Sequence, residues 1–488
     1  MPLPTIPSGN VASATAGAFE VANSCRFNDG DSPRLHRNQP STPTSTKIFT
    51  WSGWFKLGSS TSQINLASSF TASGSIYDQI KIMAKATHNQ VLRIEATSNE
   101  GNAIDLKANI SLRDPAAWMH LCLAVDTSQG VAANRDKVYL NGTQITSWAT
   151  ETHSTQNDTW HMNASGKTIT VGAYDSGTPS EFFDGYLAEI VQVDGQQLAP
   201  TSFGQFNEDS PTIWEPIDVS GLTFGNNGYY LDFEDSSALG NDVAGKGDFT
   251  AVNLAAVDQC QDSPTNNFCV GNPLDNYYYA STFSEGNCKI TTNASNKTYN
   301  TSTFAVTAGK WYFECKASDT NSDDAQFGIA SVLSTATDDE LKTSAGNYCY
   351  RSGGTKATGD SSTSYGATWN DDADIISVAL DLTNLKIYFA KNGTWQDSGD
   401  PTSGATGTGA AFTITAPASQ TIAGSIQAYT PAFGEEGAQS DVFELNFGNP
   451  SYANSSDAAD ANGYGKFEYA PPSGYLSLCS KNLGSDGG

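Results

Sequence analysis

Turn-forming residues interrupt this chain about every ten residues, and this spacing restricts the fold more than any other feature of the sequence. Clusters of Gly, Ser, Thr, Asn and Asp separate short runs rich in aromatic and β-branched residues, a pattern typical of β-strands. Convincing helical periodicity over three turns is absent, and the one short candidate lies at 336–345. The sequence therefore predicts an all-β protein, and 488 residues leave room for two antiparallel β-sandwich (jelly-roll) domains, each with its own core.

Residues 18–205 form the first predicted sandwich. An aromatic strand with a glycine bend is expected at 47–57, and 118–127 alternates between two faces as a strand does. The segment 137–145 contains Asn141 followed by glycine, which is a strong signal for a tight hairpin turn. These features predict an antiparallel sheet in this part of the chain.

The second predicted sandwich spans residues 273–478, and an ordered connector at 206–272 joins it to the first. The connector is rich in Gly, Asn and Asp but also carries several aromatic residues, which need burial, so we expect it to pack on a neighbouring domain. The ends of the chain are interpreted as an N-terminal arm, 1–17, and a C-terminal tail, 479–488. The clearest strands of the second block are expected at 309–318, 325–332, 373–382, 386–395 and 441–452.

The charge of the chain argues against two classes of partner. A formal net charge of -27 would repel phosphate backbones and anionic lipids, so we expect neither nucleic-acid nor membrane-surface binding. No run of about 18 apolar residues is present, so no membrane insertion is expected. The N-terminal segment lacks the basic and apolar regions of a signal peptide, which predicts synthesis in a cytoplasm.

The sequence offers no arrangement of residues typical of a catalytic site. Glu181, Asp184 and Glu189 are the nearest candidates for a glycosidase carboxylate set, but the first two would point to opposite faces of a strand. No HExxH metal motif and no G-x-S-x-G turn is present, and His120 is expected on the sheet surface, opposite the apolar face of its strand. We therefore predict a protein that is not an enzyme.

Calcium is the metal that the sequence favours, although no complete site is present. The stretch at 319–328 begins with alternating acidic and amide residues like a calcium loop, but it lacks the later glycine and glutamate. The stretch at 27–32 is similar and also incomplete. We expect no cofactor. Calcium is the candidate ion, and no residues are assigned to a metal site.

Eight cysteines are too few for a disulfide scaffold in a chain of this length. Cys260 and Cys269 form the one local pair that could be bridged. Spacing alone does not decide whether they are.

Two sets of phrases resemble known families. TWSGWFKL, AWMHLCLAVDT followed by KVYLNGTQI, and FDGYLAEIVQVDG make the first block similar to laminin-G-like, concanavalin-A-like sandwiches. GKWYFECKA, ISVALDLTNLKIYFAKNG and FELNFGNPSY make the second block resemble a SPRY domain. In both families these phrases correspond to strands of a β-sandwich, so the resemblance implies the same fold class as the strand pattern.

The two domain types together, with the connector between them, resemble tail-fibre and other virion structural proteins of bacteriophages. This resemblance implies a non-enzymatic structural protein (a tail fibre, spike or capsid decoration) on the virion exterior, after synthesis in the host cytoplasm. Its implied partners are other virion proteins, copies of itself in a homo-oligomer, with a trimer favoured, and host-surface glycans. The alternatives left open are a polysaccharide depolymerase on a concanavalin-A-like fold and an architectural decoration without a ligand.

The SPRY resemblance also indicates where a ligand would bind. Domains of this family bind ligands through loops at one end of the sandwich, where this sequence places Tyr348, Tyr350 and Tyr365. Aromatic faces stack on sugar rings, so these three tyrosines are the predicted ligand-binding residues. Trp369 precedes a strand at the position where the family packs an aromatic residue, and it is expected in the core.

Overall fold

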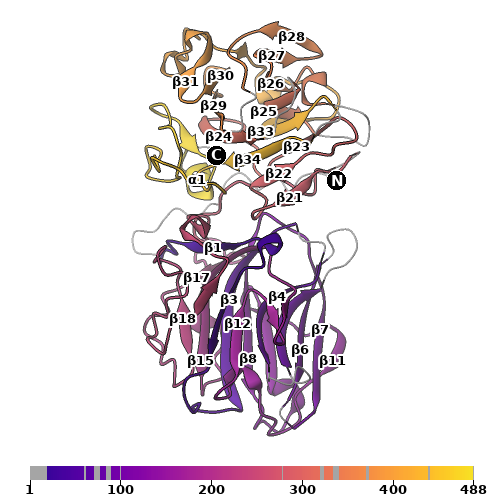
Figure 1. Ribbon diagram of the computed structural model, residues 1–488, viewed down its shortest axis with the longest axis vertical. Helices are drawn as coiled ribbons and strands as arrows, with labels where there is room; N and C mark the ends of the chain where they lie inside the picture. The colour runs from indigo at the N-terminus through magenta and orange to yellow at the C-terminus, as the bar shows by residue number, and fades with distance from the viewer. Residues whose placement is uncertain are drawn as a thin grey trace. The chain divides into compact units, whose positions relative to one another are not determined.

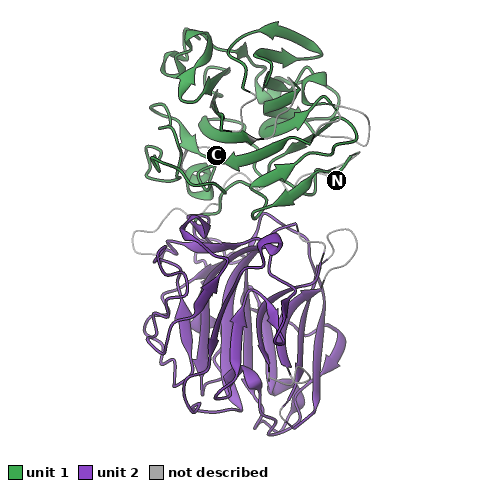
Figure 2. Ribbon diagram, viewed as in Figure 1, with its two compact units in different colours: residues 1–13, 266–488 green, residues 14–265 purple. Residues whose placement is uncertain are grey.

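Antiparallel strands make up most of the regular structure of this computed structural model (Figure 1). The structure describes residues 19–486 except 60–61, 71–76, 84–89, 99, 277–278, 319–323, 334–339, 370–372 and 438–439. The described chain divides into two compact units, which we call the first domain, up to Thr265, and the second domain, from Asn266 onward (Figure 2). The predicted all-β class with β-sandwich domains is confirmed.

The first domain contains two eight-stranded sheets. We call them sheet A and sheet B. In sheet A the strand order is β10 (Thr143–Gln144), β9 (Asp136–Leu140), β8 (Trp118–Asp126), β3 (Ile48–Leu57), β15 (Gly185–Asp194), β1 (Ser24–Phe27) and β20 (Gln259–Cys260), with β18 (Tyr229–Leu231) also paired to β15. In sheet B the order is β11 (Trp148–Thr152), β7 (Ala103–Leu112), β6 (Gln90–Thr97), β5 (Tyr77–Met83), β4 (Ile64–Phe70), β12 (Thr168–Val171), β2 (Arg34–Asn38) and β19 (Thr250–Val252).

Two short hairpins accompany these sheets in the first domain. One pairs β13 (Tyr174–Asp175) with β14 (Pro179–Ser180), and the other pairs β16 (Gly204–Phe206) with β17 (Trp214–Pro216). Both are antiparallel. The first hairpin borders the pocket described below.

The turn between β9 and β10 forms where the sequence predicts it. Asn141 and Gly142 have φ angles of 47° and 74°, the left-handed values that a two-residue hairpin turn requires. The turn fixes the register, so that Leu140 lies opposite Thr143. β9 also pairs with β8 in the antiparallel direction, as the sequence predicts for the strand that precedes this hairpin.

The core of the first domain is made of apolar residues from both sheets. Leu121 and Leu123 on β8 are fully buried in the same cluster as Ile94 and Leu106 of sheet B. Alternation along each strand supplies these residues, because every second side chain points inward. The packing of two inward faces against each other makes this domain a β-sandwich.

Residues expected to form the connector complete the first domain. β18 pairs with β15, β19 with β2, and β20 with β1, so three strands from 206–265 extend sheets A and B. Most aromatic side chains of this segment are buried, Trp214, Tyr229 and Tyr230 among them, whereas Phe206 is 44% exposed. The two units therefore divide after Thr265, whereas the sequence had placed the domain ends at 205 and 273.

The second domain contains one nine-stranded and one six-stranded sheet. In the larger sheet the order is β21 (Thr282–Ser284), β22 (Lys289–Thr291), β34 (Val442–Asn446), β24 (Lys310–Ser318), β29 (Ile375–Asp381), β30 (Lys386–Lys391) and β31 (Thr394–Trp395), with β32 (Phe412–Thr413) on β30 and β35 (Leu476–Ser477) on β24. In the smaller sheet the order is β23 (Thr298–Thr301), β33 (Ser425–Glu435), β25 (Ala325–Val332), β26 (Tyr348–Arg351), β27 (Thr355–Thr358) and β28 (Ser361–Ser364).

In the part of the chain that the structure describes, helical structure is limited to short segments. One α-helix, α1 (Ser480–Asp486), lies in the predicted C-terminal tail, and Leu483 on it packs against the core of the second domain. None of the helices in the described residues is long and apolar enough to cross a membrane. The remaining helical segments are 3-10 turns: η1 (Asp29–Asp31), η2 (Ala132–Asn134), η3 (His161–Asn163), η4 (Pro200–Ser202), η5 (Ala256–Asp258), η6 (Leu341–Thr343), η7 (Gln396–Ser398), η8 (Pro401–Ser403) and η9 (Pro417–Ser419).

The cysteine pair left open by the sequence is not bridged. Cys260 lies on β20 of the first domain, and Cys269 belongs to the second domain. Both are free thiols and both are buried.

Candidate functional site

The three predicted ligand-binding tyrosines belong to the core of the second domain. Tyr348 and Tyr350 lie on β26 and are 6% and 0% exposed, and Tyr365 is 8% exposed. The Tyr350 ring meets the Tyr365 ring edge to face at 5.5 Å and lies 5.6 Å from the ring of Phe389. The structure therefore corrects the expectation from the sequence, because no face of these rings is free for a sugar. Trp369 is fully buried, as predicted.

The hydroxyl groups of these tyrosines are also used inside the domain. Tyr348 Oη accepts from the Thr415 amide at 3.3 Å, and Tyr365 Oη accepts from the Phe389 amide at 3.4 Å. Tyr350 Oη donates to the backbone carbonyl of residue 367. These hydrogen bonds link β26 to the segments at residues 367 and 415, and they link Tyr365 to strand β30.

Neither candidate calcium stretch provides a metal site within the described residues. At 27–32 the carboxylate of Asp31 accepts from Asn28 Nδ2 at 2.8 Å within an exposed 3-10 turn. The candidate loop at 319–328 begins with residues outside the described part of the chain. Within the described residues, no three His, Cys, Asp or Glu side chains are grouped to hold a metal ion.

His120 is buried rather than on the sheet surface. The hairpin of β16 and β17 covers that face of β8, and the Trp214 indole stacks on the imidazole at 5.9 Å between ring centres. The sequence of the strand alone could not predict this cover, because Trp214 is distant in the chain. Burial lowers the pKa of His120 to about 3, so the ring is neutral at physiological pH.

The hydrogen bonds of His120 show that its contact with Ser52 is structural. Trp214 Nε1, which can only donate, lies 3.1 Å from His120 Nδ1, so that nitrogen is the acceptor. The proton of the neutral ring therefore sits on Nε2, which lies 2.7 Å from Ser52 Oγ and donates to it. A general base must accept a proton from its serine, and this tautomer does not.

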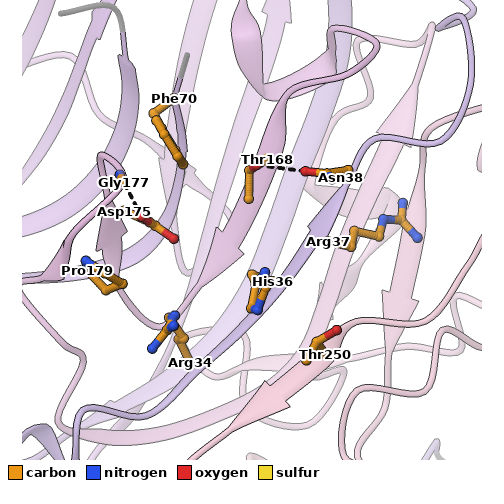
Figure 3. A pocket seen from close by; sticks show the side chains of 10 residues that line it. All are labelled: Arg34, His36, Arg37, Asn38, Phe70, Thr168, Asp175, Gly177, Pro179 and Thr250. Carbon is orange, nitrogen blue, oxygen red and sulfur yellow. Dashed lines mark hydrogen bonds between the residues drawn. The ribbon is translucent and has the colours of Figure 1, made fainter. Parts of the chain in front are cut away.

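A pocket of about 430 Å³ lies on sheet B of the first domain (Figure 3). Strands β2, β4, β12 and β19 supply one part of its wall, and the hairpin of β13 and β14 supplies another. The volume is within the range of about 300–1,000 Å³ that small-molecule sites occupy. Its lining residues are Arg34, His36, Arg37, Asn38, Phe70, Thr168, Asp175, Gly177, Pro179 and Thr250.

Strand register brings these residues together from distant parts of the chain. His36 lies opposite Thr250 on β19 and opposite Thr170 on β12. Thr168 lies opposite Phe70 on β4, and the Thr168 side chain lies on the same outer face of sheet B as that of His36. Alternation sends the intervening apolar residues into the core, so the polar side chains of the same strands form the pocket.

The hairpin of β13 and β14 holds Asp175 at the edge of the pocket. Ser68 Oγ on β4 donates to the carbonyl of Ala173 at 2.8 Å and accepts from the Asp175 amide at 3.3 Å, which anchors the hairpin. The Gly177 amide donates to Asp175 Oδ1 at 2.9 Å, and Oδ2 accepts no hydrogen bond from the described residues. Figure 3 shows the carboxylate directed toward the space beside His36.

The two arginines of β2 that line the pocket differ in their partners. Arg37 is buried, pairs with Asp242 at 3.0 Å, and points away from His36 in Figure 3. Arg34 and His36 are half-buried and make no hydrogen bond or ion pair with any described residue. Arg34 Nε is a buried donor without an acceptor among the described residues. The pocket thus offers an unpaired guanidinium, an imidazole and a carboxylate to a ligand.

Sequence reasoning did not single out the pocket residues. The stretch RLHRN at 34–38 alternates, with Leu35 pointing inward and three polar residues outward. A guanidinium and an imidazole on one face of a strand are a signal in so acidic a chain. However, the same pattern is typical of a solvated strand face, and the sequence does not reveal which strands lie beside it.

Comparison with family models supports the two domain types. Residues 29–195 match Laminin_G_3, described as the concanavalin A-like lectin/glucanases superfamily. Residues 310–424 match the SPRY domain. The chain therefore carries a concanavalin A-like, laminin-G-type domain and a SPRY domain, as predicted, and these domain types suggest carbohydrate or protein binding. No curated protein matches the chain.

Several solved structures resemble single domains of the chain. A native heptameric SAP-like pentraxin from Limulus polyphemus is 17% identical, with 37% of this chain and 80% of the pentraxin covered and a TM-score of 0.29. The SPRY domain of human HERC1 is 16% identical, with 36% of this chain and 96% of that domain covered and a TM-score of 0.27. Stonustoxin is 18% identical, with 36% of this chain and 27% of the toxin covered and a TM-score of 0.26.

Proposed function

We propose that this protein is a non-enzymatic binding protein whose first domain takes a glycan in the pocket of sheet B. The observation that carries the proposal is that Arg34 and His36 line a pocket of about 430 Å³ without any partner among the described residues. Buried polar atoms of folded proteins are normally paired, so the unpaired Arg34 Nε beside this pocket points to a ligand. The concanavalin A-like, laminin-G-type fold of the same domain agrees with this assignment.

The chemistry of the pocket suits a sugar. Arg34 can donate to ring hydroxyls, and the free oxygen of Asp175 can accept from them. Phe70 supplies an apolar ring at one end of the pocket, against which the carbon face of a sugar can pack. The pocket therefore combines an apolar surface with a few polar groups, as small-ligand sites do.

The proposal of a binding rather than a hydrolytic site is supported by the carboxylates. Glycosidases use two carboxyl groups, about 5–5.5 Å apart in retaining enzymes and about 6.5–9.5 Å apart in inverting ones. Asp175 is the carboxylate among the residues that line the pocket. Glu189, one of the acidic residues considered from the sequence, is buried against Tyr230 and does not line this pocket.

We propose further that the protein is a structural component on the exterior of a bacteriophage virion, made in the host cytoplasm. The resemblance of the domain combination to tail-fibre and other virion proteins supports this. Other virion proteins and further copies of the chain, in a trimer, would be its partners. Many copies on one particle would raise the effective concentration of weak glycan sites.

Screening of the full chain on a glycan array, followed by calorimetric titration of the hits, tests the proposed function. The variant Thr250→Trp places a large ring on an exposed pocket residue of edge strand β19 and should abolish binding. The matched control is Thr150→Trp on β11, which is also exposed and lies at the opposite edge of the same sheet. This control should bind like the unmodified chain.

The other outcomes separate the alternatives. Binding that survives Thr250→Trp would place the glycan site elsewhere and refute the assignment of the pocket. Release of shorter saccharides from a bound polysaccharide would indicate a depolymerase. Binding to no glycan by the assembled oligomer would leave an architectural role.

A further inference from the structure

We propose that the pocket of sheet B selects a glycan that carries a carboxylate, as a uronic acid does, and that the Arg34 guanidinium binds that carboxylate. This inference rests on the proposed function, because it names the class of sugar for the same site. It depends on the contrast between Arg34 and the three arginines of the domain that pair with a carboxylate, and on the position of Asp175 at the edge of the pocket.

Arg34 has no carboxylate partner among the described residues of a chain with a large excess of acidic side chains. Asp and Glu together number 52 against 25 Lys and Arg, so carboxylates are abundant. Three other arginines of this domain each pair with one: Arg26 with Asp258, Arg37 with Asp242 and Arg93 with Asp105. The lack of such a partner at Arg34 therefore distinguishes this site from those of the paired arginines.

The position of Arg34 favours a carboxylate over a neutral acceptor. Its guanidinium is half-buried, and its Nε is already removed from water without a hydrogen bond to any described residue. A buried donor without a partner is unfavourable, and a ligand that supplies an acceptor removes that cost. A guanidinium presents parallel donors that match the two oxygens of a carboxylate, and such charge-assisted pairs are stronger than neutral hydrogen bonds.

Asp175 restricts which anion can enter. Asp175 is 8% exposed and lines the pocket together with Arg34 and His36. A group that carries two negative charges, such as a phosphate monoester, would be repelled more strongly there than a single carboxylate, and the hydroxyls next to the carboxylate of a uronic acid can donate to the free oxygen of Asp175. The pocket therefore fits a uronic acid better than a phosphorylated sugar.

The net charge of the whole chain does not prevent binding of such a ligand. At physiological ionic strength, charges further away than about 8 Å are largely screened by salt. The groups that line the pocket therefore dominate the interaction with a short acidic oligosaccharide. A formal charge of -27 would still disfavour long polyanions that extend over the surrounding surface.

Calorimetric titration of the full chain with defined trisaccharides tests the inference. The probes are trimers of galacturonate, guluronate and mannuronate, each compared with the neutral trimer of the same configuration. We expect at least one acidic trimer to bind about ten-fold more tightly than its neutral counterpart, a difference of about 1.4 kcal/mol. The variant Arg34→Gln should lose this preference, so that it binds the acidic and the neutral trimer with equal affinity.

Two further variants make the test specific. Arg34→Lys keeps the charge but not the fork of parallel donors, so it should retain part of the preference. Arg113→Gln removes the same charge from an exposed residue outside the pocket lining and should behave like the unmodified chain. Circular dichroism of each variant establishes that the sheets are intact before the affinities are compared.

Each remaining outcome overturns the inference in a recognisable way. Equal affinity of the unmodified chain for acidic and neutral trimers would refute the acidic preference and leave the glycan proposal standing. Tighter binding of a sulfated trimer than of any uronate trimer would refute the carboxylate assignment. Binding to no saccharide at all would refute both the inference and the proposed function.

Discussion

Replacement of Glu189 by glutamine tests whether a buried carboxyl makes the first domain less stable at alkaline pH. Glu189 lies in a bulge of β15 with a φ of 51° and is 6% exposed. Tyr230 Oη donates to its Oε2 at 2.7 Å. Burial raises the pKa of this carboxyl to about 8, and the nearby charges of Asp232 and Glu234 also raise it.

The size and sign of the effect follow from the two pKa values. The carboxyl has a pKa of about 8 in the folded protein and 4.5 as its ordinary value, which applies to the unfolded chain. Between these pH values the folded state binds more protons than the unfolded state, so stability falls as the pH rises through this range. At about 1.4 kcal/mol for each pH unit, the unmodified chain loses on the order of 4 kcal/mol by pH 9. The amide side chain of the Glu189→Gln variant does not ionise, so the variant does not lose this stability.

Urea unfolding followed by tryptophan fluorescence, at intervals from pH 5 to pH 9, measures the difference. We expect the two proteins to unfold alike near pH 5 and Glu189→Gln to be more stable by on the order of 4 kcal/mol at pH 9. Glu208→Gln, at an exposed position of the same domain, is the control and should follow the unmodified chain at every pH. Parallel pH profiles of the unmodified chain and Glu189→Gln would refute the reasoning.

Three other predictions concern the first domain and the cysteines. Trp214→Phe removes the donor to the buried Nδ1 of His120, so the free energy of unfolding, measured by urea denaturation, should fall by about 1–3 kcal/mol. An unchanged free energy of unfolding would contradict the packing of the hairpin on β8. Gly142→Ala should lower the melting temperature more than Gly166→Ala, although the two glycines have similar φ angles of 74° and 68°. The reason is that a Cβ at 142 would lie 2.4 Å from the Trp214 ring, whereas a Cβ at 166 would meet no described atom within 4 Å. Equal melting temperatures of the two variants would refute this prediction. Titration of thiols in denaturant without reductant should find all eight cysteines free, and two fewer would reveal a disulfide.

Local sequence signals predicted a large part of the fold. Asn141 with Gly142 and Asn392 with Gly393 adopt left-handed turn conformations after strands, as their residue types favour. The alternation of Ile376, Val378 and Leu380 places all three in the core of the second domain. These features depend on neighbours in the chain, so a single sequence contains the information.

The parts that could not be predicted depend on which distant segments meet. His120 was expected on a surface because its strand alternates, yet the hairpin that contains Trp214 covers it. Tyr350 and Tyr365 have the chemistry of both a sugar-stacking platform and an aromatic core, and only their contact with Phe389 decides between the two. Alternation assigns a side chain to a face of a strand but does not say what covers that face.

The pocket of sheet B was unpredictable for the same reason. Arg34 and His36 meet Phe70, Asp175 and Thr250 through strand pairings that span much of the first domain. None of these residues forms a motif with its neighbours in sequence. A polar strand face in a single sequence does not show whether other elements enclose it.

A crystal structure of the full chain with a bound uronic acid trimer tests the central claim most directly. The account predicts sugar density in the pocket of sheet B, with a carboxylate within hydrogen-bonding distance of the Arg34 guanidinium and a hydroxyl on the free oxygen of Asp175. Density for the trimer at another surface, or an empty pocket in crystals saturated with a trimer that binds in solution, would contradict it.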